Sequence, residues 1–521
     1  MAEGIVAKAS DLRDGEMMQV SVGRRTVLLL RVEGKFYALG AKCPHYGAPM
    51  AEGLLHGHRV LCPWHKSVLD ALTGDLEDTP TLEALARFDA RVQDGNVVVT
   101  VPDRAPSERT MPMAGYDPAA DPRHFVILGG GAAGNAAAEA LRQEGFEGRV
   151  TIITKEADLP YDRPQLSKDF LGSTEEVSDP TLRPAEFYEE HGIEVRTGCE
   201  VVAADVKARR LEFADGASLD CDALLLATGG RPRRLSVEGG ELENVFTLRS
   251  LADCRRIKEV AGPGKRAVVV GASFIGMETA ASLARRGLSV TVIGREAPFS
   301  RTLGPEIGRM FQEMHEEAGT TFRMGAGLKS FEGRRKVEAV RLEDGTRVPA
   351  DLVLEGVGIE PATDMLRGAA LNEDGSVTVD AHLRVAEEVY AAGDVARFPD
   401  WRTGEPMRIE HWRLAQQHGR TAARNMVGRD APFASAPFFW TNQGGPSLGY
   451  VGATRGWDEI IYQGDPAERD FMAFYVKGGR IAAVAGLGRN VALCAALCLM
   501  EMDRMPAPDE VRGGAELAEL L

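Results

Sequence analysis

Two short motifs near the N-terminus each pair one cysteine with one histidine. Cys43 is followed by His45 and Cys62 by His65, with a proline after each cysteine. In a Rieske [2Fe–2S] cluster two His replace two Cys on one of the two irons, so the ligand set is two Cys and two His. A zinc finger groups its cysteine pair and its histidine pair separately. We therefore interpret Cys43, His45, Cys62 and His65 as ligands of a Rieske cluster, which carries one electron at a time.

The length and composition limit the remaining possibilities. A chain of 521 residues is too long for one core and predicts about three to four domains. The net charge of -16 argues against nucleic acid as a partner, and no apolar run is long enough to span a membrane. The seven cysteines show no paired framework and no Cys-x-x-Cys, and we see no signal peptide, so we expect a reducing, cytoplasmic location. Cys494 and Cys498 are expected as buried thiols on a helix.

The pattern changes twice along the chain. Residues 1–102 contain short strand-like runs punctuated by Gly and Asp, which predicts a small β domain. Residues 103–122 contain repeated prolines and few apolar residues, which is typical of a linker. From Phe125 onward the pattern becomes strand, Gly-rich turn and helix.

The first Gly-rich turn follows the strand 125–128. Glycines at the G-x-G-x-x-G positions allow a pyrophosphate to approach a helix N-terminus, and an acid after the second strand binds a ribose. Two later strand ends, one with Ala-Thr-Gly and one with Gly-Asp, add further contacts and make FAD the expected occupant. The candidate residues are Gly129, Gly131, Ala133, Gly134, Glu156, Ala227, Thr228, Gly229, Gly393 and Asp394.

A second turn of the same kind follows the strand 267–270, with Ser273 in place of the middle glycine. A second dinucleotide fold fits NAD(P)H, and a βαβ unit without a ligand is the alternative. After its second strand come Arg295 and Glu296; the acid favours NADH, whereas the arginine suits the phosphate of NADPH. We expect NADH, with NADPH possible. The candidate residues are Gly271, Phe274, Ile275, Gly276, Arg295, Glu296 and Gly358.

Long combined motifs also match a known family. The segments 129–134, 160–168, 271–278, 393–394 and 439–443 resemble those of the apoptosis-inducing-factor-like and oxygenase-coupled ferredoxin reductases. With the segment 43–49 included, the chain resembles the Rieske-fused subgroup of these FAD-dependent NAD(P)H oxidoreductases, over nearly its whole length.

The resemblance implies roles for particular side chains. Lys168 is expected near the flavin, paired with Glu278, where a cation stabilises the reduced flavin and the glutamate holds the lysine. Phe274 is expected at the nicotinamide–flavin interface, Trp412 and Trp440 near the isoalloxazine, and ordinary core packing is the alternative for all three. Two further residues, Arg163 and Pro164, are expected to line the FAD.

Three positions depart from the family pattern. Lys66 stands where a glycine usually follows the second cluster histidine, Ser273 replaces a glycine and Asn442 replaces an aspartate. The lysine puts the hydrogen bonds of the cluster loop in doubt, although not the ligands. Ser67 is a candidate donor there.

Together these features predict a multidomain chain. A small all-β Rieske domain precedes an α/β glutathione-reductase-like flavoprotein with two Rossmann-type domains, and a C-terminal α+β domain follows. The expected ranges are 1–102 for the Rieske domain, 103–122 for the linker, 123–235 with 361–430 for the FAD domain, 236–360 for the NAD(P)H domain and 431–521 for the C-terminal domain.

The expected function is electron transfer from NAD(P)H through FAD to the fused cluster, as in ferredoxin reductases. The electrons would pass on to an unidentified acceptor protein or to a partner oxygenase. The protein is expected as a monomer or homodimer. Two other functions stay open: an NADH oxidase, and a redox-sensing interaction protein with slow turnover.

Overall fold

The N-terminal residues form two antiparallel sheets in a computed structural model that describes residues 1–175 and 177–521. Strand β3 (Arg25–Val32) shows why: its alternate side chains enter two different cores. Val27 and Leu29 pack in one core, while Leu28 and Leu30 pack in a second core that also contains Cys43 and Cys62. The larger sheet has the order β1 (Ala2–Lys8), β11 (Asn96–Val101), β10 (Arg87–Gln93), β4 (Lys35–Gly40), β3 and β2 (Met17–Val22), and the smaller sheet β5 (Leu54–His56), β6 (Arg59–Leu61), β7 (Val68–Asp70) and β8 (Leu76–Asp78).

The segment 103–122, predicted as a linker, carries one short strand. Strand β12 (Glu108–Arg109) pairs with β9 (Ala84–Leu85) of the N-terminal unit. The chain then enters a six-stranded sheet. Its order is β15 (Ile193–Arg196), β14 (Arg149–Ile153), β13 (His124–Leu128), β19 (Ala223–Leu226), β33 (Val389–Ala391) and β32 (Arg384–Ala386).

Two helices meet beside this sheet. Helix α1 (Ala132–Gln143) follows β13 directly, and α7 (Trp412–Met426) packs against it. A Cβ added to Gly419 of α7 would lie 2.1 Å from the carbonyl oxygen of Ala133, so only glycine allows this close approach. The rest of this unit contains α2 (Asp169–Gly172), α3 (Ala185–Glu190), and the strands β16 (Val201–Asp205), β17 (Arg210–Phe213), β18 (Ser218–Asp220), β30 (Leu366–Arg367), β31 (Val377–Thr378), β34 (Ala396–Pro399) and β35 (Pro406–Met407).

A second parallel sheet forms the next unit, joined to the first by the strand pair β20 (Gly230–Pro232) and β29 (Ile359–Pro361). Its strand order is β21 (Val245–Phe246), β28 (Leu352–Glu355), β22 (Arg266–Val270), β23 (Ser289–Gly294) and β24 (Thr321–Met324). The helices are α4 (Leu251–Val260), α5 (Phe274–Arg285) and α6 (Pro305–Glu317), and an antiparallel sheet of β25 (Leu328–Gly333), β26 (Val337–Leu342) and β27 (Arg347–Pro349) lies at the edge.

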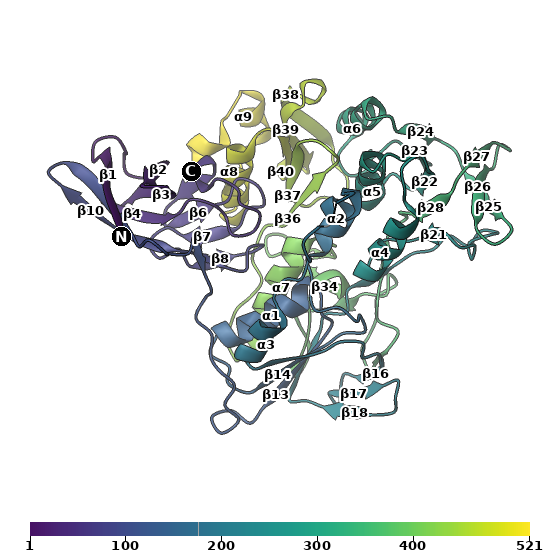
Figure 1. The fold of residues 1–521 in the computed structure, drawn as a ribbon, viewed down its shortest axis with the longest axis horizontal. Helices are drawn as coiled ribbons and strands as arrows, with labels where there is room; N and C mark the ends of the chain where they lie inside the picture. The colour runs from purple at the N-terminus through teal and green to yellow at the C-terminus, as the bar shows by residue number, and fades with distance from the viewer. Residues whose placement is uncertain (176) are drawn as a thin grey trace.

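The C-terminal residues form a five-stranded antiparallel sheet with two helices. In Figure 1 this unit lies between the N-terminal sheets and the sheet of β22. Its elements are β36 (Phe438–Asn442), β37 (Ser447–Gly452), β40 (Arg480–Leu487), β39 (Asp470–Lys477) and β38 (Glu459–Asp465) in sheet order, with α8 (Asn490–Glu501) and α9 (Pro508–Arg512). Cys494 and Cys498 are buried on α8, as predicted.

The N-terminal and C-terminal units share one hydrophobic core. Leu61 and Val68 of the N-terminal unit are fully buried in the same cluster as Phe438, Leu493 and Cys494. Burial of apolar surface between two units stabilises their association, so the N-terminal unit is packed onto the rest of the molecule.

The predicted fold class is confirmed: a β domain, two dinucleotide-type sheets and an α+β domain follow one another. Within the described residues, no helix is long and apolar enough to cross a membrane.

Candidate functional site

A cavity of about 740 Å³ opens between the two parallel sheets and strand β36. Its volume suits a cofactor-sized ligand. Most residues predicted from the sequence for FAD and for hydride transfer border it. They are Gly129, Gly131, Ala133, Glu156, Arg163, Pro164, Lys168, Ala227, Thr228, Gly229, Phe274, Ile275, Glu278, Gly358, Gly393, Asp394, Trp412 and Trp440.

Five residues predicted for the two nucleotide sites do not border the cavity: Gly134, Gly271, Gly276, Arg295 and Glu296. Gly134 and Gly276 allow close packing of helix against strand, because a Cβ there would lie 1.9 Å and 2.2 Å from the carbonyl oxygens of Gly129 and Gly271. Gly271 has a φ of 110°, which favours glycine. Their part in nucleotide binding remains a prediction.

The cavity carries polar groups that suit a dinucleotide. A Cβ on Gly131 would meet no atom within 4 Å, and no side chain caps the N-terminus of α1, which begins at the next residue. Its free N–H groups are suited to a phosphate. In the described part of the chain, Thr228 Oγ1 and His411 Nδ1 are buried without a hydrogen-bond partner. Both residues border the cavity, so the set of donors and open space fits FAD.

Two carboxylates of the cavity are held by arginines. Arg163 Nη2 lies 2.9 Å from Glu156 Oε1, just beyond β14, and Arg249 Nη2 lies 2.9 Å from Asp394 Oδ2, beyond β33. Both acids follow the carboxyl end of a strand, where ribose and ribityl hydroxyls are bound in this kind of fold.

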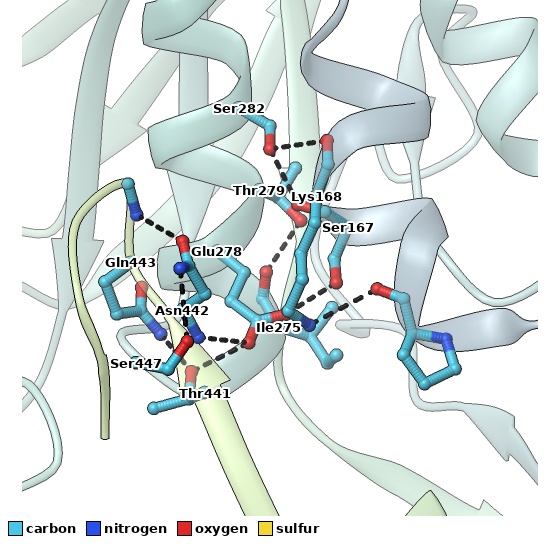
Figure 2. Close-up of polar contacts among 12 residues, drawn as sticks. Ser167, Lys168, Ile275, Glu278, Thr279, Ser282, Thr441, Asn442, Gln443 and Ser447 are labelled. Carbon is cyan, nitrogen blue, oxygen red and sulfur yellow. Dashed lines mark hydrogen bonds and ion pairs between the residues drawn. The ribbon is translucent and has the colours of Figure 1, made fainter. Parts of the chain in front are cut away.

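The carboxylate of Glu278 is the centre of a buried polar cluster (Figure 2). Glu278 lies on α5 and is 3% exposed. Lys168 Nζ is 2.7 Å and Ser167 Oγ 2.5 Å from Glu278 Oε2, and Lys168 also donates to the Pro164 carbonyl at 3.2 Å. The structure thus brings together the predicted Lys168–Glu278 pair at the edge of the cavity, in surroundings where a charge-assisted bond is strong.

The sequence reasoning missed the other side of this carboxylate. Thr441 Oγ1 donates to Glu278 Oε1 at 2.7 Å, and Gln443 Nε2 donates to Thr441 Oγ1 at 2.6 Å. Behind them, Gln443 Oε1 is 3.2 Å from Nε2 of His315, whose pKa is lowered by burial. The only signal was the position of Thr441 directly after Trp440 in a family motif.

Asn442 replaces the family's aspartate for a reason visible in the structure. Its Nδ2 donates to the Gly445 carbonyl at 2.7 Å and to Ser447 Oγ at 3.3 Å, closing the turn between β36 and β37. An ionised aspartate has no proton to donate and could not make the bond to the Gly445 carbonyl. Figure 2 shows the bond to Ser447 beside the Glu278 carboxylate.

In the second Gly-rich turn, the structure shows what Ser273 does in place of the family's glycine. Ser273 is the N-cap of α5: its Oγ accepts the Gly276 N–H and donates to the Gly356 carbonyl at 2.8 Å. The next residue, Phe274, borders the cavity and stacks on Phe299, with ring centroids 4.8 Å apart. Phe274 therefore combines core packing with a place at the cavity wall.

Arg295 and Glu296 follow β23 and are exposed. Glu296 is paired with Arg301 rather than with Arg295. Both predicted specificity residues therefore lie at the end of a strand in the sheet that carries the second Gly-rich turn. The preference for NADH remains a prediction.

The four predicted cluster ligands form two pairs. Among residues 1–175 and 177–521, no three or more His, Cys, Asp or Glu side chains are gathered as for a single metal ion. Instead the Cys43 and Cys62 thiols lie close enough to shift each other's pKa, and His45 Nδ1 lies 3.0 Å from His65 Nδ1. A thiol pair beside an imidazole pair fits a two-iron cluster better than a mononuclear zinc site.

The ionisation of His45, His65 and Cys62 suits such a ligand set, whereas Cys43 would have to lose its proton to the metal. The neighbouring Cys62 thiol and burial raise the pKa of Cys43. Against the effect of burial, Cys43 and the backbone N–H groups of His65 and Trp64 lower the pKa of Cys62 to about 7. Burial lowers the pKa of His45 to about 4 and holds that of His65 well below its usual value. Neutral imidazoles and an accessible thiolate are the forms that bind metal.

Lys66, the departure in the cluster loop, has a φ of 61°. This left-handed conformation favours the glycine that the family has there. The lysine is fully buried, and its Nζ donates to the carbonyls of Pro63 and, at 3.3 Å, Asn490 of α8. The side chain of the next residue, Ser67, acts to lower the pKa of the Cys43 thiol, and its role as a donor to the cluster remains a prediction.

Trp440 connects the cavity to the cluster motif. It borders the cavity, and its ring centroid lies 4.2 Å from that of His65 and 6.0 Å from that of His45. One aromatic side chain on β36 therefore touches both candidate cofactor sites.

Comparison with known proteins places these features in context. Residues 3–89 match the Rieske [2Fe-2S] domain, residues 123–419 the pyridine nucleotide-disulphide oxidoreductase family, and residues 438–520 the reductase C-terminal domain. The chain is 41% identical to apoptosis-inducing factor 3 of Homo sapiens over 500 residues, which cover 93% of this chain and 82% of that protein.

Bacterial reductases are also similar. Putidaredoxin reductase of Pseudomonas putida is 33% identical over 398 residues, covering 75% of this chain and 94% of that protein. The crystal structure of the covalent putidaredoxin reductase–putidaredoxin complex matches with a TM-score of 0.72 and 32% identity, over 76% of this chain and 98% of that chain.

Proposed function

We propose specific roles in electron transfer for the side chains of this chain, which belongs to the pyridine nucleotide-disulphide oxidoreductase family and carries a Rieske domain. The protein is an FAD-dependent oxidoreductase of the ferredoxin reductase type, which passes electrons from NAD(P)H to a Rieske centre. FAD supplies two-electron chemistry with nicotinamide and the cluster supplies one-electron transfer.

The glycines at the start of α1 and the acids at the strand ends hold the FAD. Gly129, Gly131 and the free N–H groups of α1 receive the pyrophosphate, since the helix N-terminus attracts anions. Glu156 and Asp394 accept hydrogen bonds from ribose and ribityl hydroxyls. The convergence of these residues on one cavity supports this assignment.

Lys168 and Glu278 are the catalytic pair. The ammonium of Lys168 stabilises negative charge that develops in the cavity, and Glu278 fixes the ammonium in place. Phe274 lies at the entrance from the second Gly-rich turn, where it orients the nicotinamide and excludes water. Glu296 selects NADH through a ribose hydroxyl.

The observation that carries the electron route is the contact of Trp440 with His65. The ring of Trp440 borders the cavity and packs 4.2 Å from the His65 ring. Cys43, His45, Cys62 and His65 hold the cluster, so the route from the cavity to the cluster lies within one chain and needs no second copy of the protein.

The final acceptor is a separate protein. Two similar proteins are named for the systems that they reduce. One is putidaredoxin reductase, and the other is the ferredoxin–NAD(+) reductase subunit of the benzene 1,2-dioxygenase system of Pseudomonas putida, to which this chain is 35% identical over 367 residues. By analogy we assign a protein acceptor, with an oxygenase as the first candidate, and a cytoplasmic location.

Anaerobic rapid mixing of the loaded protein with NADH tests the route. Flavin absorbance and the Rieske EPR signal are followed together, in the native protein and in Cys62→Ser. We expect flavin reduction first in both proteins, followed by the cluster signal in the native protein alone. A flavin that is reduced while the native cluster stays oxidised would show that the route within one chain is wrong.

A further inference from the structure

Strand β36 has two faces with different neighbours. Side chains of a strand alternate between its faces. Phe438 and Trp440 pack in the core shared with the N-terminal unit, whereas Phe439 packs with the core of α5 and β22. Thr441 follows this alternation and faces α5, where it meets Glu278.

We propose that Thr441 is a positioning residue of the enzyme, which fixes the Glu278 carboxylate and through it the Lys168 ammonium. The inference rests on the proposed role of the Lys168–Glu278 pair. It adds a third side chain, contributed by the C-terminal domain and fully buried, to a pair that the other two domains supply.

The direction of the hydrogen bonds supports this role. A threonine hydroxyl has a single proton to donate. Gln443 Nε2 donates to Thr441 Oγ1 at 2.6 Å, which leaves the threonine proton for Glu278 Oε1 at 2.7 Å. Because Gln443 Oε1 lies 3.2 Å from His315 Nε2, the amide of Gln443 is itself held in this orientation by a neutral histidine.

The two carboxylate oxygens of Glu278 thereby accept from two different sets of donors. Oε2 receives Ser167 and Lys168, whereas Oε1 receives Thr441 and, at 3.4 Å, the Asn442 N–H. Without the Thr441 hydroxyl, only Oε2 keeps strong donors, from Ser167 and Lys168. The carboxylate can then rotate about these remaining bonds. The position of the Lys168 ammonium toward the cavity then becomes less defined, which weakens a preorganised charge.

The arrangement also places two functions on adjacent residues of one strand. Trp440 meets His65, and Thr441 meets Glu278. A shift of β36 that separates Trp440 from His65 would also disturb the Lys168–Glu278 pair, so the docking of the N-terminal unit and the geometry of the catalytic pair depend on the same strand.

The test compares four variants of the full-length, cofactor-loaded protein: Thr441→Val, Thr441→Ser, Thr279→Val and Glu278→Gln. Thr279 is the matched control, because it is also a fully buried threonine, on α5, but its hydroxyl donates to the Ile275 carbonyl at 2.6 Å. The readouts are the midpoint potential of the bound flavin and the rate of flavin reduction at saturating NADH, with KM measured separately.

We expect Thr441→Val to lower the midpoint potential and to slow flavin reduction about tenfold, with little change in KM. A tenfold effect is what the loss of one hydrogen bond to a charged group should cause. Thr441→Ser should restore both values, and Thr279→Val should match the native protein. If Thr441→Val matches the native protein while Glu278→Gln is impaired, the inference is overturned. It is overturned equally if serine does not restore the values or if Thr279→Val shows the same loss, because packing then explains the effect. If Glu278→Gln itself matches the native protein, the proposed role of the pair fails.

Discussion

Arg413 of helix α7 and Asp78 of strand β8 form an ion pair of 2.6 Å between the FAD-type unit and the N-terminal unit. The guanidinium is fully buried, and its Nε also donates to the Thr79 carbonyl at 2.8 Å. Gln417, one turn further along α7, donates to the same carboxylate at 2.7 Å. Together with the shared core around Leu61 and Val68, this contact holds the N-terminal unit against the reductase.

The first prediction concerns the covalent connection. Because the docked interface contains both a shared core and a buried ion pair, we expect the N-terminal unit to stay bound after the chain is cut. A protease site inserted after Arg104, in an exposed stretch, allows the cut in the folded protein. Size-exclusion chromatography should show one species with both fragments. Separation of the fragments at micromolar concentration would mean that the unit is a tethered, mobile carrier.

A second prediction concerns Asp78. Its replacement by alanine leaves a buried, unpaired guanidinium at Arg413, which costs about 3–5 kcal/mol. We expect the cut Asp78→Ala protein to separate where the cut native protein does not. The matched control is Glu3→Ala, which removes the acid of an exposed pair with Arg91; such a change alters stability by less than about 0.5 kcal/mol. Equal behaviour of the two cut variants would contradict the importance of the Arg413–Asp78 pair.

The third prediction concerns Trp440. Replacement by leucine removes the ring that borders the cavity and contacts His65. We expect flavin reduction by NADH to change little, while cluster reduction slows by about tenfold to a hundredfold, as when a positioning contact is lost. Rapid mixing with EPR detection measures the two steps separately, and Trp440→Phe should be intermediate. A leucine variant with the native rate of cluster reduction would exclude Trp440 from the route.

Much of this arrangement could be predicted from the sequence, because the signals are local. The Gly-rich turn at Gly129 requires a helix directly after a strand, and β13 and α1 lie there. The cluster motif is also local, since each arm supplies one thiol and one imidazole. The apolar runs of β22 and β23 predicted the second sheet for the same reason.

What the sequence could not supply are contacts between distant segments. Nothing near Asp78 indicates that its partner is Arg413, and nothing near Glu278 indicates Thr441. These contacts form only when separate units pack together: the N-terminal unit against α7, and the C-terminal strand β36 against α5. Even the pairing of Lys168 with Glu278 came from a family resemblance, not from spacing or composition.

The fourth prediction concerns the choice of nicotinamide. Glu296 follows β23, where an acid binds the ribose hydroxyl of NADH and repels the phosphate of NADPH. We expect kcat/KM to be higher for NADH. Glu296→Ser should shift the ratio toward NADPH by about tenfold, the effect of one charged contact. Glu306→Ser on α6 serves as the acidic control and should leave the ratio unchanged, whereas an unchanged ratio in Glu296→Ser would remove this residue from the specificity site.

The last prediction concerns stability at low pH. His418 of α7 is fully buried between Phe398 and Phe433, with ring centroids 4.5 Å from each, and its Nδ1 accepts the Gly393 N–H at 3.3 Å. Burial lowers the pKa of His418 to about 3. In the unfolded chain a histidine takes up a proton near pH 6.5. Between these two values the unfolded state binds more protons, so the free energy of unfolding falls as the pH falls.

From pH 7 to pH 5 this single group should reduce the free energy of unfolding by about 2 kcal/mol. The contribution is lost in His418→Leu, which is less stable at pH 7 because the bond to Gly393 is missing. We therefore expect the difference in Tm between the native protein and His418→Leu to shrink as the pH falls from 7 to 5, measured by calorimetry on the loaded protein. His58→Gln, at an exposed position of the N-terminal unit, should run parallel to the native protein. A constant gap between the native protein and His418→Leu would show that His418 is not held neutral by its surroundings.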